Sequence, residues 1–268
     1  MSRIRVIIMD WAGTAVDYGC FAPVEALAGA FKTSGLSPDI DEIRAPMGLP
    51  KREHIEKMLE GERLSEMWLE KRGAPPSARD IGRIYGDFEE ALFETLGEYA
   101  DPLPGVVETV ERIRAMGILT GSTTGYTRAM MDIVAPSARE KGYGPDCIVC
   151  PEDTMGRGRP YPYMIWRNLE RLGAVSIGEA LKIGDTASDM EEARNAGCLS
   201  VGVIKGSSML GLSEKELSEK SLSERTLLFD VVRRKYIDAG ADYVMESIAY
   251  LPELIEEIED KGKTKAAT

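Results

Sequence analysis

Short apolar runs alternate with amphipathic stretches along most of the chain. Such runs, each bounded by turn-forming residues, are typical of strands buried on both faces of a parallel sheet. They occur at Arg3–Met9, Ile118–Ser122, Cys147–Cys150, Leu181–Ile183, Leu199–Ile204 and Tyr243–Met245. Stretches with helical spacing of apolar residues lie between most of them, at Val106–Met116, Tyr126–Lys141, Tyr161–Leu172 and Asp189–Ala196. The alternation predicts an α/β fold with a doubly wound, mostly parallel sheet.

One long interval breaks this alternation. Residues 17–100 contain helical stretches at Val24–Ser34, Lys51–Glu60 and Asp80–Tyr99, but no clear strand. The turn sequence DPLPG, Asp101–Gly105, marks the point at which alternation resumes. We therefore expect a helical cap domain, residues 17–100, inserted into an α/β core domain formed by residues 1–16 and 101–268.

Composition and charge narrow the classes of function. The 268 residues suffice for a core domain with an insert, and a net charge of −12 argues against nucleic-acid binding. No apolar run approaches the ~18 residues of a membrane helix, and the N-terminal run is too short for a signal peptide. We expect a cytoplasmic protein with no membrane association. The CxxC spacing of Cys147 and Cys150 lies in an apolar run, which favours a buried strand over a redox role.

Carboxylates follow two of the predicted strands. Asp10 ends the first run, and Asp185 and Asp189 lie in GDTASDM directly after the run LKI. Ligand sites of open α/β sheets lie at the carboxyl ends of strands, so Asp10 and Asp185 are expected to meet there. Clustered carboxylates require a cation, and oxygen ligands favour Mg²⁺. The alternative, a surface or helix-capping aspartate, fits Asp189 better than the other two.

Two further segments carry anion-binding side chains. Ser122, Thr123 and Thr124 lie in GSTTGYTR, where a strand gives way to a helix, and hydroxyls with backbone N–H groups at a helix start form a phosphate cradle. Simple helix capping is the alternative for each. Arg157 and Arg159 lie in GRGRPYPYM, and either can present a forked donor set to an anion. A solvated loop arginine is the alternative, and it fits Arg157 better.

The order of these motifs resembles that of the haloacid dehalogenase superfamily over nearly the whole chain. The resemblance implies that Asp10 is a nucleophile towards phosphorus and that the helical interval is the family's cap. It implies Mg²⁺ held by Asp10, the backbone carbonyl of Ala12 and Asp185, with Asp189 supporting the metal indirectly. It also implies that Ser122 or Thr124, together with Arg159, orients the phosphoryl group; the family's usual residue at the arginine position is lysine.

Ala12 departs from the superfamily's phosphatases. Most of them have a second aspartate two residues after the nucleophile, which protonates the leaving alcohol, whereas this chain reads DWAGT. Alanine is no acid, and general acid catalysis contributes about 10²–10⁴ in rate. The enzyme is therefore either impaired or attacks a bond whose leaving group is stabilised in another way.

Lys51 offers that other way. In MGLPKREHI, Pro50 suits the first turn of a helix, where the helix dipole disfavours a protonated amine at Lys51. Burial under a closed cap lowers its pKa further, and a neutral lysine attacks an aldehyde to form an imine. His54 falls on the same helix face and can transfer protons. The alternatives are a solvated surface lysine and a structural histidine.

A protonated imine accepts the electrons released when a carbon–phosphorus bond breaks. This combination closely resembles the phosphonoacetaldehyde hydrolase family, in segments that run nearly end to end. They read MDWAGTAVDYGCFAP, APMGLPKREHI, GSTTGYTRAMMDIVA, GRGRPYPYM and IGDTASDMEEARNAG. The resemblance implies hydrolysis of phosphonoacetaldehyde to acetaldehyde and phosphate during 2-aminoethylphosphonate degradation. Asp10 is then the nucleophile, Lys51 the Schiff-base residue and His54 the proton-transfer partner.

The same resemblance implies further features of the site. Met47, Gly48 and Tyr126, and less strongly Cys20, would line the aldehyde and imine region. A homodimer, formed through the cap, is also implied. The competing hypotheses are a small-molecule phosphatase, a haloalkanoate dehalogenase and a non-catalytic binding protein. Ala12 argues against the first, Lys51 against the first two, and the complete set of Asp10, Lys51 and Asp185 against the third.

Overall fold

A six-stranded parallel sheet forms the centre of the molecule. The computed structural model describes residues 4–266. The strands are β1 (Val6–Met9), β2 (Leu119–Thr123), β3 (Cys147–Val149), β4 (Ala180–Gly184), β5 (Leu199–Val203) and β6 (Tyr243–Met245), in the spatial order β3-β2-β1-β4-β5-β6. Every predicted apolar run overlaps one of these strands, so the α/β prediction is confirmed. The first run was predicted from Arg3, which lies outside the described residues, and its strand begins only at Val6.

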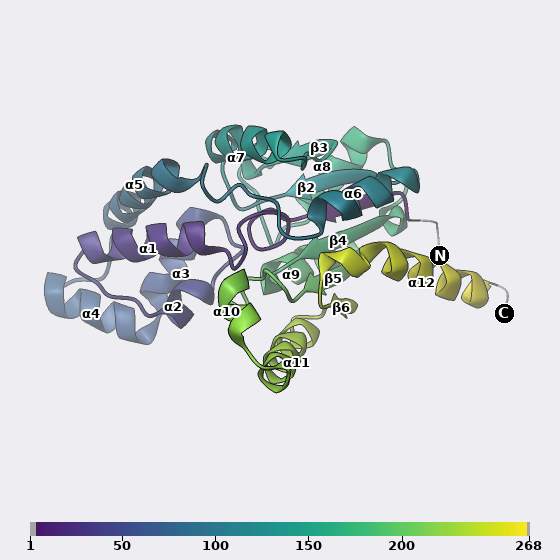
Figure 1. The fold of residues 1–268 in the computed structure, drawn as a ribbon. Helices are drawn as coiled ribbons and strands as arrows, with labels where there is room; N and C mark the ends of the chain where they lie inside the picture. The colour runs from purple at the N-terminus through teal and green to yellow at the C-terminus, as the bar shows by residue number, and fades with distance from the viewer. Residues whose placement is uncertain (1–3, 267–268) are drawn as a thin grey trace.

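Helices cover both faces of this sheet (Figure 1). Ile7 and Met9 of β1 belong to a buried cluster with α6 (Val106–Ala115), α7 (Arg128–Glu140) and α12 (Leu251–Ala266). Val6 and Ile8 point the other way and pack with α8 (Tyr163–Leu172) and α9 (Ala187–Ala196). This alternation follows from the two-residue period of a strand, and it explains why β1 is apolar at every position.

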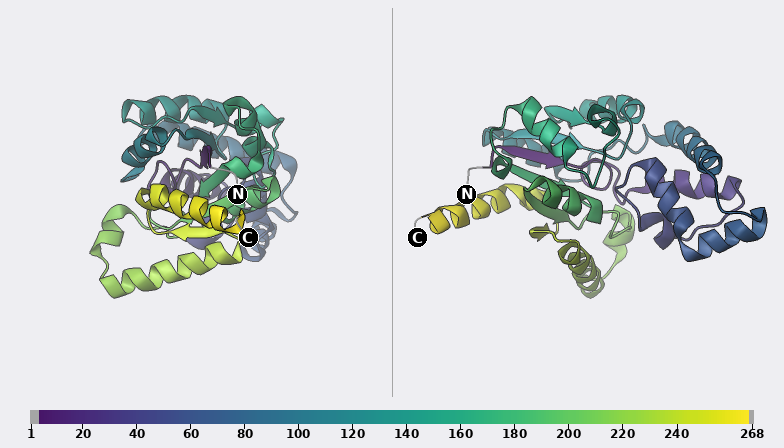
Figure 2. Two further views of the ribbon diagram at one scale, coloured as in Figure 1. Left: turned by 90° about the vertical axis from the view of Figure 1, so that its right-hand side faces the viewer. Right: turned by 180° about the vertical axis from the view of Figure 1, so that it is seen from behind.

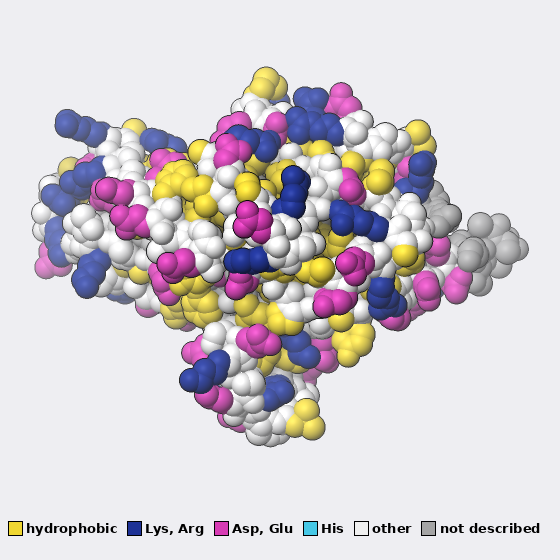
Figure 3. All heavy atoms as spheres, turned by 45° about the horizontal axis from the view of Figure 1, so that its top comes forward, with side chains coloured by type: hydrophobic (Ala, Val, Ile, Leu, Met, Phe, Trp, Pro, Cys, Tyr) yellow, Lys and Arg dark blue, Asp and Glu magenta, His cyan; other side chains and the backbone are white. Residues whose placement is uncertain are grey.

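The charged segment after β5 forms two helices at the edge of the sheet. They are α10 (Glu214–Glu219) and α11 (Leu222–Asp238), and Phe229, Val232 and Tyr236 of α11 pack against Met190 and Ile204. Three short 3-10 helices complete the core, at η1 (Pro151–Thr154), η2 (Ile177–Glu179) and η3 (Ile248–Tyr250). Basic and acidic side chains are interspersed over the face shown in Figure 3.

Five helices form a bundle beyond one end of the sheet (Figures 1 and 2). They are α1 (Phe21–Thr33), α2 (Ile40–Arg44), α3 (Lys51–Glu60), α4 (Glu62–Arg72) and α5 (Ala78–Thr95). The described residues between 17 and 100 contain no strand. One buried cluster runs from Leu27 and Phe88 of the bundle to Ile7 of the sheet. The division into a cap domain and a core domain therefore stays a prediction.

The chain passes from sheet to bundle and back at a single place. Val16 forms one bridge with Ala12 and a second, antiparallel bridge with Pro102. The backbone N–H of Leu103 donates to the carbonyl oxygen of Ala15 at 2.9 Å. The two connecting segments are thus bonded to each other where they leave the core.

Cys20, Cys147, Cys150 and Cys198 are free and buried, and Cys147 lies in β3 as the buried-strand interpretation predicted. Within residues 4–266, no helix is long and apolar enough to cross a membrane.

Candidate active site

Three neighbouring strands deliver polar residues to one edge of the sheet. Asp10 follows β1, Thr124 follows β2 and Asp185 follows β4, and β1 lies between the other two strands. Asp189, in the first turn of α9, joins them, so that one carboxylate oxygen from each of Asp10, Asp185 and Asp189 lies within 4.8 Å of the others. The aspartates that the sequence predicted to cluster do lie together.

Arg159 bridges two of these carboxylates. Its Nη2 atom lies 2.9 Å from Asp10 Oδ1, and its Nη1 atom forms an ion pair with Asp189 Oδ1. The side chain is 2% exposed, and a buried guanidinium requires partners of this kind. The predicted nucleophile and the predicted phosphoryl-binding cation are therefore in direct contact.

Hydrogen bonds fix the Asp185 carboxylate in place, but its surroundings disfavour its ionised form. Thr14 Oγ1 donates to its Oδ1 at 3.3 Å, and the Ser208 N–H donates to its Oδ2 at 2.8 Å. Burial, followed by the negative charges of Asp10 and Asp189, raises the pKa of Asp185 to about 8. A divalent cation beside this group would offset the repulsion, and the all-oxygen donor set fits a hard cation such as Mg²⁺.

Asp189 has both carboxylate oxygens engaged by protein groups. Its Oδ2 accepts from the N–H and the hydroxyl of Thr186, and its Oδ1 pairs with Arg159 and, at 2.8 Å, with Lys182 Nζ. Burial alone would raise the pKa of Asp189, but the charges of Arg159 and Lys182 lower it to about 2. Because both of its oxygens are bonded to protein groups, Asp189 is suited to orienting Arg159 and Lys182.

A buried network that the sequence analysis missed lies behind Asp189. Lys182 of β4 is 0% exposed, and its Nζ atom donates to Thr123 Oγ1 at 2.7 Å and pairs with Glu192 Oε2 at 3.3 Å. Thr123 donates in turn to Glu192 at 3.0 Å. The available signal was the lysine within the apolar run LKI, because a lysine is almost never fully buried unless it is paired.

The three hydroxyls after the second run point to different places. Ser122 donates to the Cys147 carbonyl oxygen at 3.3 Å, and Thr123 belongs to the network of Lys182. Thr124 lines the cavity beside Asp10, and its Oγ1 accepts from the Tyr126 N–H at 3.0 Å. Among the three, only Thr124 lies where it can meet a bound phosphoryl group.

A small cavity lies between the bundle and the sheet. Its volume is about 20 Å³, close to that of one water probe. Residues from both parts of the chain line it, namely Asp10, Ala12, Cys20, Met47, Gly48, Lys51, Thr124, Gly125, Tyr126, Arg159 and Thr186. All four residues predicted for the aldehyde pocket are among them. A cavity of this volume holds no more than about one water molecule, so a larger ligand can enter only if the bundle moves away from the sheet.

The loop before α3 brings Lys51 into this cavity. Gly48 has φ +94, and a Cβ atom there would lie 2.4 Å from Thr186 Oγ1, so the backbone approaches the core as only glycine permits. Pro50 is the N-cap residue of α3, and Lys51 is the first residue of the helix. Lys51 is 5% exposed, and its Nζ atom lies 3.9 Å from Met47 Sδ. Burial is the largest influence on this amine and lowers its pKa.

His54 is buried one turn further along α3 and does not line the cavity. Its Nε2 atom lies 2.8 Å from the carbonyl oxygen of Ile43, and within the described structure Nδ1 has no hydrogen-bond partner. Burial and the nearby charge of Lys51 lower the pKa of His54 to about 3. The ring is therefore neutral at physiological pH, with Nε2 as the donor and Nδ1 as the free acceptor.

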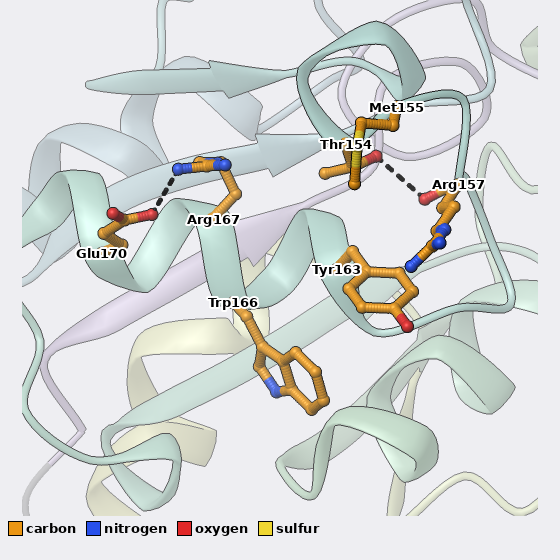
Figure 4. Close-up of a pocket in the computed structure, with 7 residues that line it drawn as sticks. All are labelled: Thr154, Met155, Arg157, Tyr163, Trp166, Arg167 and Glu170. Atoms are coloured by element: carbon orange, nitrogen blue, oxygen red, sulfur yellow. Dashed lines mark hydrogen bonds and ion pairs between the residues drawn. The ribbon is translucent and has the colours of Figure 1, made fainter.

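Arg157 lies apart from the site, in a surface hollow of about 200 Å³ (Figure 4). Its guanidinium carbon lies 5.1 Å from the centre of the Tyr163 ring. The hollow is lined by Thr154, Met155, Arg157, Tyr163, Trp166, Arg167 and Glu170, and it contains none of the clustered aspartates. The interpretation of Arg157 as a surface-loop arginine agrees with this position.

Comparisons with known proteins agree with this geometry. A family model described as haloacid dehalogenase-like hydrolase matches residues 4–197. The chain is 47% identical to a phosphonoacetaldehyde hydrolase of Bacillus cytotoxicus over 96% of this chain and 97% of that one. It is 45% identical to a bifunctional phosphonoacetaldehyde hydrolase/aminoethylphosphonate transaminase of Clostridioides difficile, of whose length it spans 41%.

A solved structure is similar over almost its full length. The crystal structure of a phosphonoacetaldehyde hydrolase-like protein from Oleispira antarctica matches with a TM-score of 0.94 and 32% identity, covering 97% of this chain and 94% of that one. Family model, relatives and structure agree, and the chain belongs to the phosphonoacetaldehyde hydrolase family of haloacid dehalogenase-like hydrolases.

Proposed function

We propose that this protein hydrolyses the carbon–phosphorus bond of phosphonoacetaldehyde, with Lys51 as the imine-forming residue and Asp10 as the phosphoryl acceptor. One observation carries the proposal. A single closed cavity is lined both by Lys51 from the bundle and by Asp10 from the sheet, with Ala12 where an ester hydrolase needs an acid. The relatives named as phosphonoacetaldehyde hydrolases support the same substrate.

The first step belongs to Lys51. Burial favours its neutral amine, which adds to the aldehyde carbon; loss of the carbonyl oxygen as water gives an imine, and uptake of one proton from solvent gives the protonated imine. The amine lies 3.9 Å from Met47 Sδ and faces the Tyr126 ring, and these bulky side chains keep bulk water away from this bond. The carbon bonded to phosphorus is then attached directly to the imine carbon, so the imine can accept the electron pair of the carbon–phosphorus bond.

The second step belongs to Asp10. A carboxylate oxygen attacks phosphorus, the carbon–phosphorus bond breaks, and its electron pair moves into the imine to give an enamine. Arg159, 2.9 Å from Asp10, supplies positive charge where the phosphoryl oxygens gather. Water then hydrolyses the aspartyl phosphate to phosphate. Protonation of the enamine at carbon and hydrolysis of the resulting imine release acetaldehyde and regenerate Lys51.

This sequence explains Ala12. No alkoxide leaves at any step, so no aspartate is required two residues after the nucleophile. Asp10, the Ala12 carbonyl oxygen and Asp185 would hold Mg²⁺, which when bound neutralises phosphoryl charge beside the nucleophile. Asp189 orients Arg159 and does not itself need to bind the ion.

His54 completes the proposal as a proton carrier. Its ring lies outside the cavity lining, and its free acceptor is Nδ1, so a proton that passes between His54 and Lys51 requires an intervening water molecule.

A homodimer formed through the bundle is part of the same proposal. Light scattering during gel filtration measures that mass directly, and a monomer would contradict it.

Borohydride trapping tests the proposal. Phosphonoacetaldehyde and sodium borohydride are added to the Mg²⁺-loaded enzyme, and peptide mass spectrometry locates the reduced adduct. With borohydride we expect a single reduced adduct on Lys51. Without borohydride we expect the enzyme to release phosphate. Phosphate release from phosphonoacetaldehyde without any trappable adduct would remove the imine step. Release from simple phosphate esters at similar rates would favour the phosphatase alternative, against which Ala12 argues.

A further inference from the structure

Arg44 ends α2 and reaches out of the bundle to two other parts of the chain. Its Nη1 atom donates to the carbonyl oxygen of Gly19 at 2.9 Å and to that of Ser208 at 2.9 Å. Gly19 lies in the connecting segment before α1, and Ser208 lies in the core loop after β5. One nitrogen atom thus ties the bundle both to its connecting segment and to the core.

Ser208 on its other side holds Asp185. The Ser208 N–H donates to Asp185 Oδ2 at 2.8 Å, and Ser208 is buried. The same residue therefore accepts a hydrogen bond from the bundle and donates one to a carboxylate of the proposed cation site. A displacement of Arg44 acts on Asp185 through a single intervening residue.

Two groups confine the Arg44 guanidinium, whose Nε and Nη2 atoms have no hydrogen-bond partner within the described structure. The ring centre of Phe21 lies 5.3 Å from the guanidinium carbon, at cation–π distance. Gly211 has φ +65 in the same core loop as Ser208, and a Cβ atom there would lie 3.2 Å from the guanidinium carbon. Any side chain at position 211 would therefore crowd the guanidinium.

The contact also spans the boundary at which the site must open. A cavity of about 410 Å³ lies beside Arg44 and Ser208, and it shares Met47 and Thr186 with the closed cavity of the site. A withdrawal of the bundle along this boundary would break the hydrogen bond from Arg44 to Ser208. Whether this hydrogen bond is formed thus depends on whether the bundle is closed.

We propose that Arg44 is a positioning residue that couples closure of the bundle to the placement of Asp185 through Ser208. The inference rests on the proposed function, in which Asp185 holds the divalent cation. It deepens that function, because cation binding and closure over the phosphoryl group then favour each other. Such coupling is reciprocal, so a phosphoryl ligand that closes the bundle must tighten cation binding by the same factor.

The test measures this coupling directly in the full chain. Calorimetry gives the dissociation constant of Mg²⁺ with and without saturating inorganic phosphate, the product of the proposed reaction. For the wild type we expect phosphate to tighten Mg²⁺ binding about tenfold, within the usual range of coupling between sites. For Arg44→Gln we expect a clearly smaller factor, which reflects only the direct attraction between phosphate and the cation, with the affinity for Mg²⁺ alone unchanged. Arg44→Lys, with a single donor nitrogen, should give an intermediate factor and serves if the glutamine variant does not fold.

Arg72→Gln is the matched control. Arg72 also lies over an aromatic ring, that of Trp68 at 5.5 Å, and donates to a backbone carbonyl, that of Ser34 at 3.4 Å, but all three residues belong to the bundle. This variant should keep the wild-type coupling. Hydrogen exchange of the segment around Ser208 gives a second reading, because Mg²⁺ and phosphate together should slow it in the wild type and in Arg72→Gln but not in Arg44→Gln.

The outcomes separate this inference from the function on which it rests. Full coupling in Arg44→Gln, or an equal loss in Arg72→Gln, overturns the role of Arg44 and leaves the proposed function intact. Loss of Mg²⁺ affinity in Arg44→Gln without phosphate would show a purely structural role and overturns it as well. A wild type that binds no Mg²⁺ removes the cation site itself, and this inference with it.

Discussion

The Nζ atom of Lys51 lies 5.7 Å from the centre of the Tyr126 ring, across the boundary between α3 and the loop after β2. Two opposing influences act on the pKa of this amine. The ring face favours the ammonium form, whereas burial, the larger influence, disfavours it and lowers the pKa. The net direction favours the neutral nucleophile that an imine requires, and it depends on the bundle being closed.

Replacement of Lys51 by arginine should abolish turnover while leaving the positive charge in place. Arginine cannot form the imine, so we expect phosphate release to fall by roughly 10³-fold or more and the borohydride adduct to disappear. Lys57→Arg in the same helix is the control, because Lys57 is exposed and pairs with Glu60 at 2.7 Å, away from the cavity of the site. Substantial activity in Lys51→Arg would mean that Lys51 only binds the anion.

Cation binding should release a proton. Asp185 has a pKa of about 8 without a cation, so most of it is protonated at pH 7 and must ionise to coordinate Mg²⁺. We expect Mg²⁺ affinity to rise with pH up to about 8 and then to level off. Calorimetry in buffers of different ionisation enthalpy measures this proton release, which should vanish well above pH 8 and in Asp185→Asn.

Chelation should abolish activity, and added Mg²⁺ should restore it. Activity that does not change on chelation would exclude the metal.

Acidification should destabilise the fold through His54. The pKa of His54 is about 3 in the folded protein and about 6.5 in the unfolded chain, so below pH 6.5 the unfolded chain binds the extra proton. This histidine should remove about 2 kcal/mol from the free energy of unfolding between pH 7 and pH 5. His54→Gln keeps an N–H for the carbonyl oxygen of Ile43 and should show a correspondingly smaller loss in urea unfolding. Equal slopes in the two proteins would contradict a buried neutral ring.

Asp17 should act in the opposite direction. Its carboxylate accepts from the N–H groups of Phe21 and Ala22 at the start of α1, yet burial raises its pKa to about 6. The folded protein then holds this proton more tightly than the unfolded chain, so the stabilisation is complete below about pH 4 and is lost as the pH rises through 6. The loss amounts to about 3 kcal/mol at most. Asp17→Asn should flatten this part of the unfolding profile, and an unchanged profile would contradict the shift.

The sequence predicted the strands and the aspartate cluster because both depend on local pattern. An apolar run such as Val6–Met9 must be buried on both faces, and parallel strands place Asp10 and Asp185 at one edge. The boundaries of the helices were less accurate. The helix expected from Tyr126 begins at Arg128, because the Thr127 hydroxyl caps it by accepting from the Met130 N–H.

Residues whose role depends on distant partners could not be predicted in this way. Lys182 is stabilised by Thr123 of β2 and by Asp189 and Glu192 of α9, which lie far from each other in the sequence. Arg44 contacts Gly19 and Ser208, and no local pattern links these positions. Ser122 and Thr124 are similar in sequence context, and only the three-dimensional structure shows that Thr124 faces the cavity.

The bridges of Val16 to Ala12 and Pro102 carry a consequence for how such enzymes diversify. Because the chain leaves the sheet and returns to it at one bonded point, the order of the strands does not depend on the segment between Val16 and Pro102. An unrelated insert whose ends meet at the same spacing would leave the scaffold intact. Lys51 travels with the insert, whereas Asp10 stays with the scaffold. In the proposed reaction, exchange of the insert would therefore change the group that meets the nucleophile, while Asp10 and Ala12 stay with the sheet.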